Sequence, residues 1–479
     1  MREAPRRRDL ESLVGGRARQ VGGCPRRVGG CARRTAPGPW LAALFAVVLL
    51  PAVLLPAAPA RSQSRPGGPY REVLPNGLTL IVQEQRTSPL VAVQAWVRVG
   101  SRDEDDETNG ASHFVEHMLF KGTARRKVGE IDREVAELGG QINASTFFDY
   151  TQYWLAAAGR FFERLVDLQA DALRHSSFDA AEVERERQVI IEELNRREDS
   201  PFVRTFDRLY TTAFTVHPYR RPIGGSREVI RRMSRETLLA FYRRYYVPAN
   251  VTIVVAGDVV TADAVRVLRR AYASWRGPRP ERPPAPAEPP WTGVRRAVVE
   301  QDVRAAYLHL GWLAPAARDP DLAATDVLVY ALGQGRGARL LQALRDRRRV
   351  AQSVSAFFPT AQDPTLVSLY VVTEPELAAE AERALLEEVA AVRDGDLSEE
   401  EVARARALLE GEALRTRHTS RGLATTLGFY ATVAELEAGL GYVERVRAVT
   451  RADVQRVARR FLDPGRYAAV LVRPRTSAP

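Results

Sequence analysis

An internal repeat constrains the fold of this chain more than any other feature of its sequence. The string TRADVQRVARRFLDPGRYAAVLV at 450–472 follows the pattern of SRETLLAFYRRYYVPANVTIVV at 234–255. In the same way, LSEEEVARARALLEGE at 397–412 follows FDAAEVERERQVIIEE at 178–193. The two offsets agree within a few residues, which indicates one duplicated α+β unit. Because 479 residues are too many for one hydrophobic core, we expect two similar domains.

The boundaries of these domains follow from composition. Residues 277–290, GPRPERPPAPAEPP, form a Pro-rich connector. The connector divides an N-terminal domain at 61–276 from a C-terminal domain at 291–475. Residues 1–60 precede both domains and have the composition of a targeting segment rather than of a folded unit.

Residues 40–60 form an apolar run that ends in Ala-Pro-Ala, a small-x-small cleavage pattern. We interpret residues 1–60 as a signal peptide, which predicts an exported protein, periplasmic or secreted. The alternative is an uncleaved membrane anchor, because the run is long enough to span a bilayer. Both cysteines of the chain, Cys24 and Cys31, lie in this leader, so the body has no disulfide.

The charge of the chain gives no indication of a nucleic-acid partner. The net charge is +11, but residues 1–38 hold ten Arg against three acidic residues and account for most of it. The remaining net charge of +4 is spread over more than four hundred residues. We therefore expect no nucleic-acid binding.

Strand patterns begin the first repeat. Residues 71–85 hold two extended runs around an Asn-Gly pair, the strongest short hairpin signal, and 91–99 alternates as a strand. Residues 141–156 have the pattern of two strands that meet at a turn. Between these segments, the acidic string DEDDE at 103–107 predicts a solvated turn.

The string HFVEH at 113–117 carries the chemistry. On a helix, His113 and His117 lie one above the other on one face, with Glu116 beside them. Two imidazoles placed in this way can hold one Zn²⁺, which needs a third protein ligand and an open position for water. Glu116 then fits the role of general base. The alternative is a helix with a polar face, but the chain has six histidines in all, and two of them in register with a Glu favour a metal site.

These residues give the chain a resemblance to the pitrilysin family of zinc metallopeptidases, in its bacterial processing-peptidase-like short form. The order HxxEH is the inverted zincin arrangement. The string HPY at 217–219 is also typical of the family, and the second repeat carries DLAATDVLVYALGQG, with no His, where the motif helix should stand. The resemblance covers roughly residues 70–475. It implies two domains, each a mostly antiparallel sheet with helices packed on one face, that form a clamshell around peptide.

The resemblance also assigns the rest of the metal site. Glu193, in the string IEEL, lies at the family's separation from His117 and is implied as the third ligand, beside His113 and His117. Glu192 is the adjacent rival, but it faces about 100° away on a helix and matches no family ligand. Glu186 lies two turns before Glu193 on the same face, where the family has a residue that supports the reacting water and catalysis. The alternative for these glutamates is an ordinary solvated helix face.

Substrate contacts are implied as well. The first strand of 141–156 corresponds to an exposed edge strand to which the family adds substrate peptide, with Asn143 and Ala144 binding its backbone; the alternative is an interior strand. The family also carries an Arg and, seven residues later, a Tyr that reach towards substrate from the second domain. Here these positions hold Arg345 and Gln352, so the Tyr is missing. Either Gln352 donates one weaker hydrogen bond in place of the Tyr, or the chain belongs to a homo- or hetero-oligomer in which a sister subunit supplies the Arg and the Tyr; we favour the oligomer.

Taken together, these features predict an exported zinc endopeptidase that hydrolyses peptides or unfolded polypeptide segments. The competing hypothesis is a non-catalytic structural or assembly subunit of the same fold. The intact His113, Glu116 and His117 disfavour that alternative.

Overall fold

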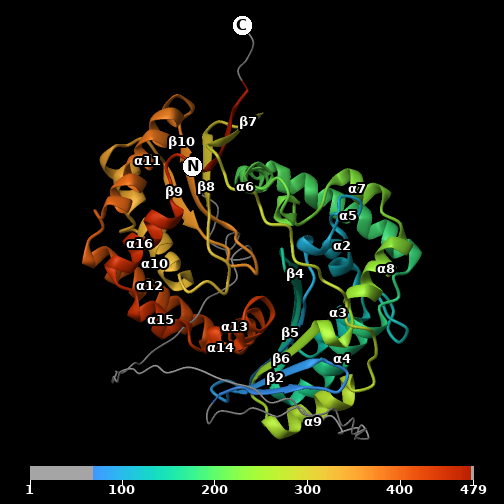
Figure 1. Ribbon diagram of the computed structural model, residues 1–479. Coiled ribbons are helices and arrows are strands. Elements are labelled where there is room, and N and C mark those ends of the chain that lie inside the picture. The colour runs from blue at the N-terminus through green and yellow to red at the C-terminus, as the bar shows by residue number, and fades with distance from the viewer. Residues whose placement is uncertain (1–67, 476–479) are drawn as a thin grey trace, which may run out of the picture.

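The computed structural model describes residues 68–475, and these residues form two α+β halves, each with one sheet (Figure 1). The predicted signal peptide, residues 1–60, lies outside the described residues. Within residues 68–475, no helix is both long enough and apolar enough to cross a membrane. The predicted fold class is confirmed.

The first half is built on a six-stranded sheet with the strand order β1-β2-β6-β3-β5-β4. Neighbouring strands are antiparallel except for the parallel pair of β2 and β6. The predicted hairpin at 71–85 and the three strands predicted after it, one at 91–99 and two within 141–156, are present. The strands are β1 Tyr70–Val73, β2 Thr79–Glu84, β3 Leu90–Val97, β4 Gln141–Thr146, β5 Thr151–Ala158 and β6 Val251–Gly257.

The helices of the first half include the motif helix α2 and the long helix α5, which pack on each other. Short 3₁₀ turns join several elements: η1 Ser101–Asp103, η2 Gly159–Phe161, η3 Pro218–Arg220 and η4 Pro248–Asn250. The helices are α2 Ala111–Met118, α3 Glu130–Glu137, α4 Phe162–His175, α5 Ala180–Asp199, α6 Pro201–Ala213, α7 Arg227–Arg232, α8 Arg235–Tyr245 and α9 Thr261–Tyr272.

The acidic loop before α2 differs from the expected solvated turn. The Glu104 side chain is buried and accepts hydrogen bonds from the backbone N–H groups of Gly110 (2.7 Å) and Ser112 (2.8 Å). These are unpaired donors at the start of α2, so the carboxylate caps the motif helix. Burial raises the pKa of Glu104, although these hydrogen bonds oppose the shift. The prediction was wrong for this residue, because charge composition does not show which side chain of an acidic run turns inward.

The second half repeats the topology of the first. Its five-stranded sheet has the order β7-β11-β8-β10-β9, and its one parallel pair, β7 with β11, corresponds to β2 with β6. The strands are β7 Arg295–Gln301, β8 Ala306–Leu313, β9 Ser353–Phe357, β10 Leu366–Thr373 and β11 Ala468–Pro474. The helices are α10 Leu322–Gly333, the π-helical segment η5 Leu341–Arg347, the 3₁₀ turn η6 Pro375–Leu377, α11 Ala378–Asp394, α12 Glu399–His418, α13 Ser420–Val433, α14 Leu436–Leu440, α15 Tyr442–Ala448 and α16 Arg451–Phe461.

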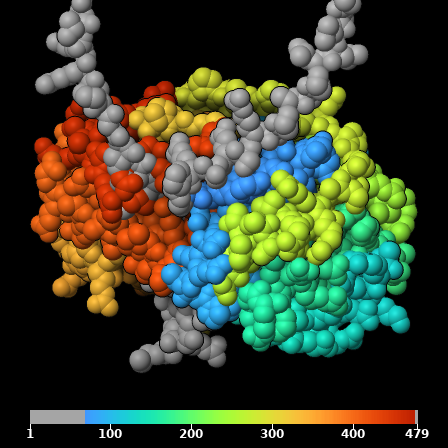
Figure 2. Space-filling view, turned by 90° about the horizontal axis from the view of Figure 1, so that it is seen from below, coloured from blue at the N-terminus to red at the C-terminus, as the bar shows by residue number. Residues whose placement is uncertain are grey.

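The two halves exchange one helix each. Helix α6 of the first half packs on β8 and β11 of the second sheet, whereas α13 of the second half packs on β3 and β6 of the first. A threonine anchors each crossing helix: Gln94 Nε2 donates to Thr425 Oγ1 (3.0 Å), and His309 Nδ1 lies 3.1 Å from Thr205 Oγ1. Seen from below, the orange second half lies directly against the blue part of the first (Figure 2).

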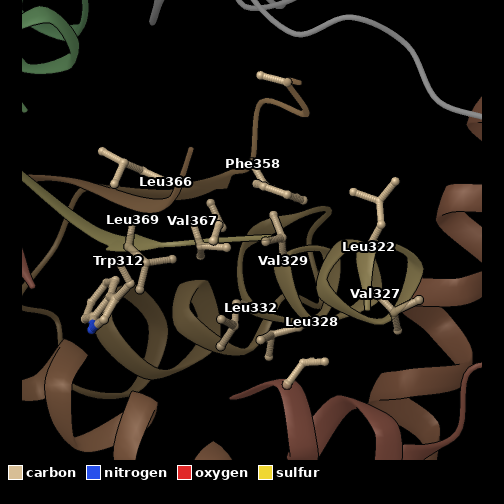
Figure 3. Packing of buried hydrophobic residues seen from close by; sticks show 14 of the residues in the cluster. Trp312, Leu322, Val327, Leu328, Val329, Leu332, Phe358, Leu366, Val367 and Leu369 are labelled. Carbon is tan, nitrogen blue, oxygen red and sulfur yellow. The ribbon is translucent and has the colours of Figure 1, made fainter. Parts of the chain in front are cut away.

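Helix α10, which replaces the motif helix in the second half, is apolar on nearly all sides. Figure 3 shows its side chains packed with those of the second sheet, including Trp312 and Leu369. The same core cluster includes Phe206 and Leu209 of the crossing helix α6. Helix α10 is therefore buried among the elements of the second half.

The Pro-rich connector 277–290 is held against the first half. Arg282 forms a two-pronged ion pair with Asp103 (2.7 and 2.9 Å), and Glu288 accepts hydrogen bonds from the backbone of Thr215 and Val216. Burial opposes ionisation of Glu288, but these donors lower its pKa to about 2. These contacts attach the connector to the first half, so it is not a free linker.

Candidate metal centre

Three side chains converge where α2 packs on α5. His113 and His117 lie one turn apart on α2, and Glu193 projects from α5. The two Nε2 atoms are 3.3 Å apart. Glu193 Oε2 lies 3.6 Å from His113 Nε2 and 3.5 Å from His117 Nε2. Within residues 68–475 this is the one group of three such side chains with ligand geometry, and it consists of the three predicted ligands.

The spacing of these atoms fits Zn²⁺. Nitrogen and oxygen ligands lie about 2.0–2.2 Å from zinc, so the ligand atoms of a tetrahedral site are separated by about 3.3–3.6 Å. The three observed separations have these values. Glu192, the rival ligand, is exposed and lies outside the group.

The electrostatics of the site also suit a cation. Burial and the neighbouring His117 lower the pKa of His113 to about 4, so His113 is a neutral imidazole at pH 7. Burial opposes protonation of His117, but Glu186 and Glu193 raise its pKa to about 9. The hydrogen bond from His117 lowers the pKa of Glu193 to about 2. A metal that binds here therefore displaces a proton from His117.

Glu116 lies beside the ligands and contacts the neighbouring sheet. Its Oε2 accepts a hydrogen bond from the Thr146 hydroxyl at the end of the edge strand β4. Burial raises the pKa of Glu116 to about 7, although the Thr146 hydrogen bond opposes the shift. A carboxylate with a pKa near the working pH exchanges a proton readily, which suits a general base.

Glu186 contacts a ligand. Its Oε2 lies 3.1 Å from Nδ1 of His117, and its Oε1 lies 2.7 Å from Nζ of Lys121. Burial opposes ionisation of Glu186, but His117 and Lys121 lower its pKa. A carboxylate in this position fixes the ring orientation of a histidine ligand. The role predicted for Glu186 in supporting the reacting water stays a prediction.

The strand predicted to bind substrate lies at the open edge of the first sheet. Asn143 and Ala144 are in β4, whose one neighbour in the described sheet is β5. The Asn143 side chain accepts a hydrogen bond from the backbone N–H of Ala144 (2.8 Å). The interior-strand alternative is therefore wrong, while the binding of peptide by Asn143 and Ala144 stays a prediction.

The structure does not bring Arg345 and Gln352 into contact with the metal ligands. Arg345 pairs with its neighbour Asp346 (2.7 and 3.1 Å), and Gln352 Nε2 donates to Glu374 (2.6 Å). Within the described part of the chain, neither side chain forms a hydrogen bond or ion pair with the site. The substrate role of Arg345 stays a prediction.

Two residues of the site escaped sequence reasoning. Thr146 orients Glu116, and Lys121 holds Glu186. Lys121 follows the motif by one helical turn, which is a signal for proximity; Thr146 carries no comparable signal, since its contact depends on how β4 packs beside α2.

Comparison with known proteins agrees with this geometry. The family model "Insulinase (Peptidase family M16)" matches residues 79–227, and the model "Peptidase M16 inactive domain" matches residues 232–409. A zinc protease of Mycobacterium tuberculosis is 32% identical over 431 residues, which cover 88% of this chain and 97% of that protein. The chain belongs to peptidase family M16. The resemblance to pitrilysin-type peptidases is thereby confirmed.

Two further M16-like proteins extend the comparison. A probable mitochondrial-processing peptidase subunit beta of Arabidopsis thaliana is 29% identical, over 81% of this chain and 75% of that protein. The crystal structure of a protease from Helicobacter pylori superposes with a TM-score of 0.81 at 26% identity, covering 84% of this chain and 99% of that one. This M16 chain therefore shares its fold across nearly the whole length of a solved protease.

Proposed function

We propose that this M16 protein is a zinc-dependent endopeptidase that hydrolyses peptides or unfolded polypeptide segments. The observation that carries the proposal is the convergence of His113, His117 and Glu193 at zinc-ligand spacing, with Glu116 beside them. The zinc-protease names of the relatives support it.

Each residue of the site has a task in hydrolysis. His113, His117 and Glu193 would hold Zn²⁺, which would supply Lewis-acid polarisation of the substrate carbonyl and lower the pKa of water at the site towards about 7. The Glu116 carboxylate accepts a proton from the attacking water on one oxygen and passes it to the leaving amine. The Thr146 hydroxyl keeps the Glu116 carboxylate turned towards the ligands.

The edge strand β4 is the proposed platform for the substrate backbone. An extended peptide that adds to β4 pairs with Asn143 and Ala144 by strand addition. Because Asn143 Oδ1 now accepts from the Ala144 N–H, that contact opens when the peptide binds. Arg345 is proposed to contact the peptide from the second half. A platform of this kind needs an extended, unfolded segment, which disfavours folded substrates.

We further propose that the protein acts as the metal-bearing subunit of a pair and is exported. The family Tyr is replaced by Gln352, which pairs with Glu374, and one relative is named as a subunit of a processing peptidase. Export is proposed from the apolar run at 40–60, and the mass of the mature chain tests it. A chain that begins after Ala60 fits a cleaved signal; an intact leader fits a membrane anchor through residues 40–60.

The competing function is a non-catalytic assembly subunit. The match to an inactive M16 domain covers 232–409, whereas the segment with His113, Glu116 and His117 matches the model of the insulinase type. The HxxEH motif is therefore complete in the N-terminal half, the half that matches the insulinase model.

The decisive experiment combines zinc content with cleavage of a peptide library. We expect wild type to bind one zinc per chain and to lose cleavage when a chelator is added. Glu116→Gln should retain zinc and lose about 10²–10⁴-fold in kcat, the usual contribution of a general base. Full zinc occupancy with no cleavage by wild type, alone or with a partner, supports the assembly subunit.

A further inference from the structure

Lysine is nearly absent from this chain. Of its 70 Lys and Arg residues, Lys121 and Lys127 are the two lysines. Arginine is therefore the usual cation of its ion pairs, as in the partly buried cluster of Arg126 with Asp167 and Asp171. In a chain that otherwise uses arginine, each lysine position can be asked whether it requires an ammonium group in place of a guanidinium.

The two lysines have different surroundings. Lys127 is exposed, and its backbone N–H donates to Glu130. Lys121 lies just beyond α2, where its Nζ contacts Oε1 of Glu186 at 2.7 Å. The Glu186 side chain is 7% exposed, whereas the Lys121 side chain is 33% exposed. Lys121 thus brings its charge to a carboxylate that is almost removed from solvent.

The two oxygens of Glu186 serve different donors. Oε1 accepts from Lys121, and Oε2 lies 3.1 Å from Nδ1 of His117. When Nδ1 of His117 carries the proton and donates it to Glu186, Nε2 is the nitrogen left for a metal. That Nε2 atom is the one that faces Glu193. A chain of contacts therefore runs from Lys121 through Glu186 to the ligand atom of His117.

The shape of the cation matters for this chain of contacts. An ammonium is a compact point charge that can bind one carboxylate oxygen, whereas a guanidinium is a planar fork that pairs with both oxygens. An arginine at position 121 would compete with His117 for Oε2 of Glu186. We propose that Lys121 is a positioning residue of the metal site: it holds Glu186 by one oxygen, so that the other oxygen orients His117 towards zinc.

This inference rests on the metal site of the proposed function but not on peptide hydrolysis. The test is the zinc affinity of the full chain, measured by competition with a chromogenic chelator after the metal has been removed. We expect Lys121→Met to weaken zinc binding by about 10–100-fold, the usual effect of removing an outer-shell partner. Lys121→Arg should also weaken it, although the charge is kept. Lys127→Met, the matched control, should bind zinc like wild type.

Thermal unfolding of the metal-free proteins separates positioning from a merely structural ion pair. A variant that loses thermal stability but binds zinc like wild type points to a structural ion pair and overturns the inference. Wild-type affinity in Lys121→Arg overturns the argument from the shape of the cation. If Lys121→Met does not fold, Lys121→Gln replaces it in the same assay.

The outcomes also distinguish this inference from the proposed function. Wild type that binds zinc but cleaves no peptide contradicts the peptidase and leaves the Lys121 comparison intact. Wild type that binds no zinc contradicts both. Zinc binding by Lys121→Met that equals wild type contradicts the role of Lys121 alone.

Discussion

The two halves of the protein hold a glutamate at the same place and give it different partners. Glu193 and Glu412 occupy the same position of two twenty-residue helices, α5 and α12. In the first half, Glu193 faces His113 and His117 of α2. In the second half, Glu412 accepts a hydrogen bond from the Tyr330 hydroxyl of α10. Both α2 and α10 follow the corresponding strand, β3 or β8.

This difference shows how the same helix pair can carry a candidate metal site in the first half and a hydrogen-bonded pair in the second half. Imidazoles leave a lone pair for a cation, so the carboxylate of Glu193 is placed where it could serve as a third ligand. A phenol donates a hydrogen bond, so the Glu412 carboxylate has a hydrogen-bond donor as its partner in place of two imidazole nitrogens. The rest of the packing, α2 on α5 and α10 on α12, is retained.

The largest expected effect is on zinc binding, when the equivalent glutamates Glu193 and Glu412 are replaced. Glu193→Gln removes a ligand and should weaken zinc binding by more than about 100-fold, the upper end for a mere outer-shell change. Peptide cleavage should be lost with the zinc. Glu412→Gln, the matched control, should retain both, because Tyr330 can still donate to the amide oxygen. Zinc content and kcat of the two purified variants check the pair.

Equal loss of zinc in Glu193→Gln and Glu412→Gln would contradict the proposal that zinc binds in the first half alone. It would mean that the second half contributes to metal binding through Glu412, or that either change disrupts the common scaffold. Circular dichroism of both variants separates these two explanations.

A smaller effect is expected where the crossing helices meet the sheets. A side chain at Gly428 of α13 would collide with the indole of Trp96, which is fixed by a 3.0 Å hydrogen bond to Gln94. Gly428→Ala should therefore lower the free energy of unfolding by about 1–3 kcal/mol, as overpacking does. A methyl group at Gly311 meets the flexible ends of Leu209 and Leu366 at 3.0 and 3.2 Å, so Gly311→Ala should cost less.

Urea unfolding of the two alanine variants measures this difference. We expect the contact of α13 with the first sheet to be the tighter of the two, so that Gly428→Ala loses more free energy of unfolding. If Gly311→Ala lowers the free energy of unfolding more than Gly428→Ala does, the contact of α6 with the second sheet is the tighter one and the prediction is wrong.

The remaining prediction concerns the pH dependence of the same two contacts. His309 and Gln94 each lie beneath a crossing helix and contact Thr205 and Thr425. Burial lowers the pKa of His309 to about 3, from 6.5. Protonation is therefore easier in the unfolded chain. The contribution of His309 to stability is fully present above about pH 6.5 and is lost as the pH falls towards about 3, by at most about 1.4 kcal/mol per pH unit.

We expect His309→Gln to flatten this pH dependence, since an amide does not titrate in this range. The free energy of unfolding of the metal-free protein, measured at pH 5 and pH 7, gives the slope. Gln94→Asn is the control and should keep the wild-type slope. An unchanged slope in His309→Gln would show that His309 reaches solvent when it is protonated.

Local patterns were sufficient to predict much of the site. The spacing of HFVEH at 113–117 placed two predicted ligands on one helix, and the two-turn spacing of Glu186 and Glu193 placed them on a second helix, α5. Helical periodicity and the resemblance to the pitrilysin family then favoured Glu193 over Glu192 as the third ligand. These predictions succeed because a helix fixes which side chains share a face.

Contacts between distant segments could not be predicted in this way. The apolar face of α6 indicates that it is buried but not that it covers the sheet of the other half. Likewise, the contact of Thr146 with Glu116 depends on the packing of an edge strand beside a helix. The capping of α2 by Glu104 depends on which member of an acidic run turns inward. Tertiary packing decides each of these contacts.

The most direct test of the account is the position of the metal. Crystals of the zinc-loaded protein, measured at the zinc absorption edge, should show one anomalous peak per chain, about 2.0–2.2 Å from His113 Nε2, His117 Nε2 and a Glu193 oxygen. No peak should lie between Tyr330 and Glu412. A zinc-loaded crystal without a peak at the three predicted ligands, or with its peak elsewhere, would contradict the account.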